Sequence, residues 1–254
     1  MFNGEYFIQK VDLKEHPKYQ PGSKWESAIK DYYVYVDQEI GKTLEILDDD
    51  TTKLVVSDHG VKKMDGGICI NEWLIKNGYL KLFSRPNEIT RLQNKMIDFK
   101  NTIAWAAGGY YARVFLNVKG REPQGVISRE DYEKVRDEII DKLEAMTDPD
   151  GKNIGTRAFK PQEVYKVCRN IPPDLIVYLG DLHWRSIGSV GFDSIYTFEN
   201  DTGPDDAVHD KFGVFVMYPG NGKLDGVSIY DFAPTLLSQL GIKAPLHMEG
   251  KVIK

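Results

Sequence analysis

The sequence predicts an α/β fold in which a central β-sheet is flanked by helices. Two observations predict it. Short β-branched runs alternate along the chain with segments of helical periodicity. The expected strands are also apolar on both faces, as in a sheet that is covered on both sides. The length of 254 residues suits one such domain, so we expect residues 1–254 to form a single α/β domain.

The first expected elements are a helix, a strand and a second helix. Apolar residues recur at helical spacing over 25–47, with Ser23 as the expected N-cap. The β-branched run 53–57 predicts a strand, and because it is apolar on both faces we expect it in the centre of the sheet. A short helix over 70–78 follows, closed by Asn77-Gly78.

Two strands and a helix are expected in the middle of the chain. The runs 102–105 and 113–116 are rich in strand-forming residues, and Gly108-Gly109 separates them. Strong helical periodicity over 128–146 then begins at Ser128, which is an expected N-cap.

The last third contains two strands and a final helix. Residues 175–178 and 214–217 are apolar runs typical of buried strands. Between them, residues 179–211 are rich in Gly, Ser and Asp, which indicates a long loop. Ser228 caps an expected helix over 229–240.

The composition is typical of a soluble globular protein, with 41% hydrophobic and 28% charged residues. No apolar run approaches the roughly 18–20 residues needed to cross a bilayer, and the first residues do not resemble a signal peptide. Cys69 and Cys168 lack metal-site spacing, which fits a reducing compartment. We therefore expect a cytoplasmic protein without a membrane partner. A net charge of −5 and the absence of a long basic block argue against nucleic-acid binding.

An acid and a histidine follow the strand at 53–57, in the segment LVVSDHG. Carboxylate and imidazole groups both bind Zn²⁺ or Mn²⁺, and Gly60 permits a close or left-handed turn around Asp58 and His59. In α/β sheets ligands bind beyond strand ends, and His209 precedes another strand, so we expect these residues to converge. From spacing alone a second interpretation is open, in which Asp58 belongs to a turn and His59 is a half-exposed surface residue.

Three further positions have open alternatives. Arg185, near a strand end, could bind a substrate phosphate with two hydrogen bonds or could pair with a nearby acid. Asp205-Asp206 could orient His209 or form a solvated loop. His247 could be a ligand, but we expect it to be a surface residue.

Six segments, taken in order, resemble a known family. They are YVDQEIGKTLEILDDDTTKLVVSDHG, INEWLIKNGYLKL, RVFLNVKGREPQGVI, DLIVYLGDLHWRSIGSVG, YTFENDTGPDDAVHDKFGVFVMYPG and SIYDFAPTLLSQLGIKAPLHMEGKVI. The set resembles the type I phosphodiesterase / nucleotide pyrophosphatase-like phosphohydrolases of archaea and bacteria, in the alkaline phosphatase superfamily. The resemblance runs from about residue 10 to the end, and no chemical role follows from it for Arg113, Asn117 or Arg121.

The resemblance implies a two-metal hydrolase acting on phosphorylated small molecules. In the superfamily two divalent ions, Zn²⁺ or Mn²⁺, lie roughly 3.5–4 Å apart. Asp58 and His59 match the ligand pair of the ion beside the nucleophile, and His209 matches a ligand of the other ion. The implied reaction is hydrolysis of a phosphodiester, pyrophosphate or phosphomonoester.

The sequence departs from the family at its N-terminal side. The family carries its nucleophile, a first metal-binding Asp and a further Asp and His upstream of the segment that resembles VDLKEHPKY. Asp12 and His16 have suitable spacing but lie within that later segment, so we assign them no metal role. No catalytic nucleophile is found, and we expect this chain to be the C-terminal half of a larger enzyme. Self-association or a complementary N-terminal half is the expected partner.

Two other functions stay open. A phosphomutase or phosphotransferase of the same superfamily would differ in what accepts the phosphoryl group. A noncatalytic α/β module that binds a metal or a partner would fit the absence of a nucleophile.

Overall fold

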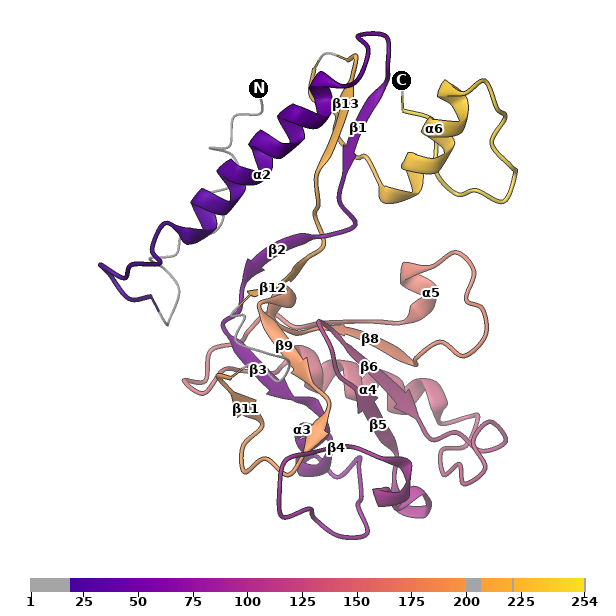
Figure 1. Ribbon diagram of the computed structural model, residues 1–254. Helices are drawn as coiled ribbons and strands as arrows, with labels where there is room; N and C mark the ends of the chain where they lie inside the picture. Colours follow the sequence, from indigo (N-terminus) through magenta and orange to yellow (C-terminus); the bar gives the residue numbers. More distant parts are fainter. Residues whose placement is uncertain (1–18, 200–206, 221, 254) are drawn as a thin grey trace. The chain divides into compact units, whose positions relative to one another are not determined.

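The computed structural model describes residues 19–199, 207–220 and 222–253. It is a mixed α/β structure with several small sheets (Figure 1). The described residues separate into two compact units. Unit 1 comprises residues 24–61, 210–220 and 222–253, and unit 2 comprises 19–23, 62–199 and 207–209. In the described residues the chain passes between the units after Ser23, within β2 (Gly60–Lys63) and within β12 (Ala207–Asp210). The expectation of a single domain over 1–254 stays a prediction.

The largest sheet lies in unit 2 and has four antiparallel strands in the order β5-β6-β8-β7. These are β5 (Ala104–Ala107), β6 (Ala112–Leu116), β8 (Leu175–Tyr178) and β7 (Arg157–Phe159). Three of the four were predicted from apolar runs, and Gly108-Gly109 separates β5 from β6 as expected. The β7 strand was not predicted.

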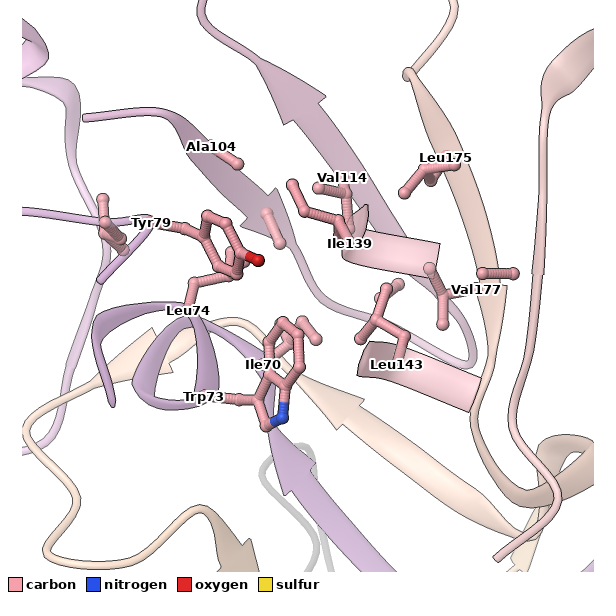
Figure 2. Close-up of a cluster of buried hydrophobic side chains, with 14 of the residues drawn as sticks. Ile70, Trp73, Leu74, Tyr79, Ala104, Val114, Ile139, Leu143, Leu175 and Val177 are labelled. Carbon is pink, nitrogen blue, oxygen red and sulfur yellow. The ribbon is translucent and has the colours of Figure 1, made fainter. Parts of the chain in front are cut away.

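Helices α3 (Ile70–Lys76) and α4 (Tyr132–Glu144) supply apolar side chains to the core of unit 2. In Figure 2, Ile139 and Leu143 of α4 point toward Val114 of β6 and Val177 of β8. All four side chains are fully buried. Burying an aliphatic side chain of this size contributes about 1.5–3 kcal/mol, so this helix–sheet contact is a main source of stability for unit 2.

Both long helices begin a few residues after the predicted caps. The expected N-cap Ser128 lies one turn before α4, where its Oγ accepts a hydrogen bond from the Asp131 N–H at 3.1 Å. In unit 1, α2 (Ala28–Glu45) begins after Ser27 instead of Ser23. A short turn precedes each helix, and spacing alone does not separate such a turn from the helix it leads into.

A second sheet in unit 2 carries part of the candidate site. Its central strand β3 (Gly66–Cys69) pairs antiparallel with β11 (Tyr196–Thr197) and parallel with β9 (Trp184–Ile187). Two shorter strands, β4 (Thr90–Arg91) and β10 (Ser189–Val190), pair with each other. The prediction of a long loop over 179–211 was therefore wrong, because strands of two to four residues leave little apolar signal in a Gly-rich segment.

Unit 1 contains α2, a two-stranded antiparallel sheet and a C-terminal helix (Figure 1). The sheet pairs β1 (Lys53–Val56) with β13 (Phe215–Tyr218). β1 was predicted as a central, covered strand, and this was wrong: in the described residues it has one neighbour, and Val55 is 37% exposed. A four-residue apolar run predicts a strand but does not determine how many strands or helices cover it.

The C-terminal helix has the capping that the sequence predicts. The 3₁₀ turn η5 (Ile229–Asp231) leads into α6 (Phe232–Gln239), and the Ser228 Oγ accepts a hydrogen bond from the Tyr230 N–H. The remaining elements are α5 (Pro161–Val164), η2 (Asn94–Met96), η3 (Phe99–Asn101) and η4 (Leu179–Leu182). Within the described part of the chain, every helix is too short or too polar to span a bilayer.

Candidate functional site

The turn that carries Asp58 and His59 is held by hydrogen bonds to Val214, the residue just before β13. Ser57 donates its N–H to the Val214 carbonyl at 3.0 Å, and its Oγ accepts the Val214 N–H at 2.7 Å. These two bonds fix the end of β1 within unit 1. The Asp-His pair therefore leaves the strand from a defined position.

Gly60 is required in this turn because of a close backbone approach. A Cβ at position 60 would lie 2.0 Å from the Phe212 carbonyl oxygen, a distance that no side chain permits. Gly60 does not have a positive φ. Of the two reasons expected for a glycine here, the structure confirms the close approach and contradicts the left-handed backbone.

The His59 ring has its two nitrogen atoms in different environments. Nδ1 lies 2.7 Å from the Gly60 carbonyl oxygen, and Nε2 faces Oδ1 of Asp58 at 3.7 Å. A carbonyl oxygen only accepts hydrogen bonds, so Nδ1 carries the proton, and in the neutral ring Nε2 then presents a lone pair toward Asp58. The side chains are 42% exposed for His59 and 86% exposed for Asp58.

This pair fits two ligands of one divalent ion. Imidazole nitrogen and carboxylate oxygen bind Zn²⁺ at roughly 2.0–2.2 Å, so one ion can span donor atoms that are 3.7 Å apart. A hydrogen bond from Nδ1 to a backbone carbonyl is the usual support of a metal-binding histidine. Among residues 19–199, 207–220 and 222–253, no group of three or more His, Cys, Asp or Glu side chains is arranged to hold a metal.

Arg185 and His209 belong to unit 2, where both contact Tyr110. The Arg185 guanidinium carbon lies 5.0 Å from the centre of the Tyr110 ring. The His209 ring stacks on the same ring, with centroids 3.4 Å apart and planes 17° from parallel. Because the contact is made by the face of the His209 ring, the two ring nitrogen atoms at its edge do not take part in the stacking. A cation, a phenol and an imidazole are therefore grouped in one place.

The backbone brings Tyr110 to Arg185. Arg185 is buried in β9, opposite Gly67 of β3. Gly109 and the next β9 residue, Ser186, exchange hydrogen bonds of 2.8 and 3.0 Å. Tyr110 follows directly in sequence, which places its ring beside the guanidinium.

The predicted site residues fall in both units. Asp58 and His59 belong to unit 1, whereas Arg185 and His209 belong to unit 2. Their convergence at one site therefore stays a prediction. Within unit 2 the structure groups Arg185 with His209.

Sequence reasoning missed Tyr110, although the Gly108-Gly109 break next to it was a usable signal. His209 was expected in a loop and lies in β12. His247 is exposed, as predicted. Asp12, His16, Asp205 and Asp206 lie outside the described residues.

Comparison with known proteins gave one match. The profile of the type I phosphodiesterase / nucleotide pyrophosphatase family matches residues 11–205, which is more than half of the chain. The matched range includes Asp58, His59 and Arg185 and ends before His209. Searches of curated proteins and of solved structures found no match. The resemblance seen in the sequence is thus confirmed, and the chain belongs to the type I phosphodiesterase / nucleotide pyrophosphatase family, within the alkaline phosphatase superfamily.

Proposed function

We propose that this chain takes part in metal-dependent hydrolysis of phosphodiester or pyrophosphate bonds in small molecules. Its family generally acts on such bonds. Asp58 and His59 hold one divalent ion, Zn²⁺ or Mn²⁺, and His209 is a ligand of a second. Arg185 binds a phosphate oxygen of the substrate.

One observation carries the proposal. The hydrogen-bonding geometry of His59 puts the Nε2 lone pair opposite the Asp58 carboxylate. Two acceptor atoms face each other, and this arrangement favours a cation between them. The hydrogen bond from Nδ1 to the Gly60 carbonyl sets the tautomer in which Nε2 can act as a metal ligand.

Each residue has a distinct task in this proposal. Bound ions supply charge that stabilises the phosphoryl transition state and lowers the pKa of the attacking group. The Gly60 carbonyl keeps the His59 ring in the tautomer that leaves Nε2 for the metal. Tyr110 orients both the His209 ring and the Arg185 guanidinium through their faces.

We further propose that the complete site draws on residues beyond this set. A catalytic zinc commonly has three protein ligands of its own, so Asp58, His59 and His209 are too few for two ions. A complementary N-terminal half that carries the nucleophile, or a second copy of this chain, is the expected source. The chain alone is then expected to bind metal with little turnover.

The test measures metal content and hydrolysis of bis-p-nitrophenyl phosphate on the same samples, with added Zn²⁺ or Mn²⁺ and after EDTA. Asp58→Ala and His59→Ala are expected to weaken metal binding by more than the roughly 10–100-fold typical of a lost supporting contact. His247→Ala removes an exposed histidine and is the matched control.

The outcomes separate the parts of the proposal. Metal binding that is lost in both site variants, without turnover, supports an incomplete hydrolase. Metal-dependent turnover by the chain alone would overturn the need for further residues. Metal binding that is unchanged in both site variants would overturn the assignment of Asp58 and His59.

A further inference from the structure

A pocket of about 410 Å³ in unit 2 has a strongly cationic lining. Small-molecule sites typically have volumes from roughly 300 to 1,000 Å³. The lining residues are Val118, Lys119, Gly120, Arg121, Arg129 and Tyr132. Three of these six residues are cationic, and since the Arg121 charge is offset by Asp174 and Glu122, Lys119 and Arg129 give the pocket its preference for an anion.

Arg121 lines this pocket, and its side chain is held in place by hydrogen bonds within the protein. It donates two hydrogen bonds of 2.7 Å to the buried Asp174 carboxylate, one of 2.6 Å to the Leu116 carbonyl, and one of 2.7 Å to Glu122. The Tyr132 hydroxyl is also committed, because it donates to Asp174 at 2.5 Å. These two side chains therefore shape the pocket, and their strongest polar interactions are already made within the protein.

Lys119 and Arg129 differ from Arg121 because their side chains do not form such hydrogen bonds or ion pairs with the described residues. Both are exposed, and neither makes a side-chain hydrogen bond or ion pair with any residue in the described part of the chain. Their two positive charges are available to a ligand. Recognition in this pocket thus depends on Lys119 and Arg129.

Gly120 follows Lys119 in sequence and lies beside Arg129 in space. Its φ of +81° is a conformation that side chains rarely adopt. The Arg129 Nη2 lies 3.6 Å from where a Cβ of residue 120 would be, so the guanidinium lies close to the glycine. At that distance a Cβ would make only ordinary contact with the guanidinium, so the positive φ is what favours glycine at position 120.

We propose that this pocket is a second, noncatalytic binding site for a phosphate-type dianion, free or as the terminal group of a nucleotide. A guanidinium binds two oxygen atoms of a phosphate at once, and an ammonium adds a point charge. The loop backbone is already held by the hydrogen bond from the Lys119 N–H to the Ile127 carbonyl, so the entropic cost of binding falls on the Lys119 and Arg129 side chains. The site shares no residue with Asp58, His59, Arg185 or His209 and does not depend on the proposed hydrolytic function.

Isothermal titration calorimetry of the full chain tests this proposal, with inorganic phosphate, AMP and adenosine as probes. EDTA in every sample prevents binding of phosphate to a metal. We expect saturable binding of phosphate and AMP but not of adenosine. AMP that binds more tightly than phosphate would identify a nucleotide as the better ligand, and equal affinities would identify the phosphate group alone.

Variants identify the residues that bind. The double variant Lys119→Gln/Arg129→Gln is expected to weaken phosphate binding roughly tenfold or more. Lys134→Gln, which removes an exposed charge on α4 outside the pocket, is the matched control and should bind as the wild type does. An unchanged melting temperature in the double variant verifies that its fold is intact.

Three results would overturn the proposal: no saturable binding by the wild type, equal weakening in Lys134→Gln, or normal binding by the double variant. Loss of binding in Arg185→Gln with normal binding in the double variant would place the anion at Arg185 instead.

Discussion

The Asp174 carboxylate and the Arg121 guanidinium form a two-point ion pair in unit 2, with both nitrogen–oxygen distances at 2.7 Å. Asp174 lies just before β8 and is almost fully buried, whereas the Arg121 side chain is 44% exposed. The carboxylate also accepts hydrogen bonds from the Leu116 N–H and the Tyr132 hydroxyl. One buried acid therefore connects β6, α4 and the loop that carries the cationic pocket. The same network raises the pKa of Tyr132 to about 12, through burial of the phenol and its bond to Asp174.

We predict that Asp174→Asn destabilises the protein by roughly 2–4 kcal/mol, because it leaves the Arg121 charge without its buried partner. Urea unfolding followed by circular dichroism measures the change. Asp141→Asn makes the same substitution at an exposed position of α4 and should stay within about 0.5 kcal/mol of the wild type. Similar losses in the two variants would contradict the role given to Asp174.

A second prediction concerns the glycine beside the candidate metal ligands. Gly60→Ala would put a methyl group 2.0 Å from the Phe212 carbonyl, so the turn must shift and the His59 ring loses its hydrogen bond to the Gly60 carbonyl. We expect metal affinity to fall at least tenfold, measured by Zn²⁺ titration. Gly41→Ala is the control, because Gly41 lies within α2 with nothing near its Cβ position. That change should stabilise the protein by roughly 0.5–1 kcal/mol and leave metal affinity unchanged. Normal Zn²⁺ binding by Gly60→Ala would contradict the geometric argument.

The sequence predicts where strands occur better than it predicts how many strands lie beside them or how deeply they are buried. The apolar runs at 102–105, 113–116 and 175–178 correspond to adjacent strands of one sheet, because burial on a helix-covered sheet requires apolar residues there. The run at 53–57 is also apolar at its centre, yet its strand has one neighbour in unit 1 and Val55 is 37% exposed. Local composition does not encode the number of neighbours, which depends on segments more than a hundred residues away.

The candidate site was predictable only where its residues are adjacent in sequence. Asp58, His59 and Gly60 follow one another, so their chemistry could be read directly. The contact of Tyr110 with Arg185 depends on a bridge between Gly109 and β9, and the ion pair of Arg121 with Asp174 joins residues 53 positions apart. No spacing rule predicts such contacts from a single sequence.

A third prediction concerns the buried Asn71 of α3, which joins two backbone segments. Its amide donates to the Ala106 and Gly188 carbonyls at 2.9 and 2.7 Å, and its carbonyl accepts the Ala106 N–H at 2.9 Å. Asn71→Ala leaves these buried groups without partners, so we expect a loss of roughly 2–4 kcal/mol in urea unfolding. Asn101→Ala removes an exposed amide bonded to Asp98 and should cost less than about 1 kcal/mol. Equal losses of stability in Asn71→Ala and Asn101→Ala would contradict the structural role given to the Asn71 hydrogen bonds.

The last prediction concerns acid stability in unit 1, where a buried carboxylate joins the C-terminal segment to η5. Asp231 accepts hydrogen bonds from the N–H groups of Lys251 and Ser228, at 2.8 and 3.0 Å. These bonds, with Lys251 the larger contributor, hold the pKa of Asp231 below its ordinary value. A carboxyl group with a lowered folded-state pKa stabilises the protein fully above its unfolded pKa of about 3.9, and this contribution is lost as the pH falls through the folded pKa.

Asp231→Asn removes this dependence. We expect the variant to be less stable than the wild type at pH 7 by roughly 1–3 kcal/mol, and the difference should shrink as the pH falls below about 4. Urea unfolding at pH 7, 5, 4 and 3 measures how the free energy of unfolding of the variant and of the wild type depends on pH. Asp225→Asn, at a position that is 82% exposed, is the control and should follow the wild type at every pH. If the Asp231→Asn and wild-type curves instead fall in parallel, the acid dependence resides in other carboxylates, and the hydrogen bonds from Lys251 and Ser228 do not control it.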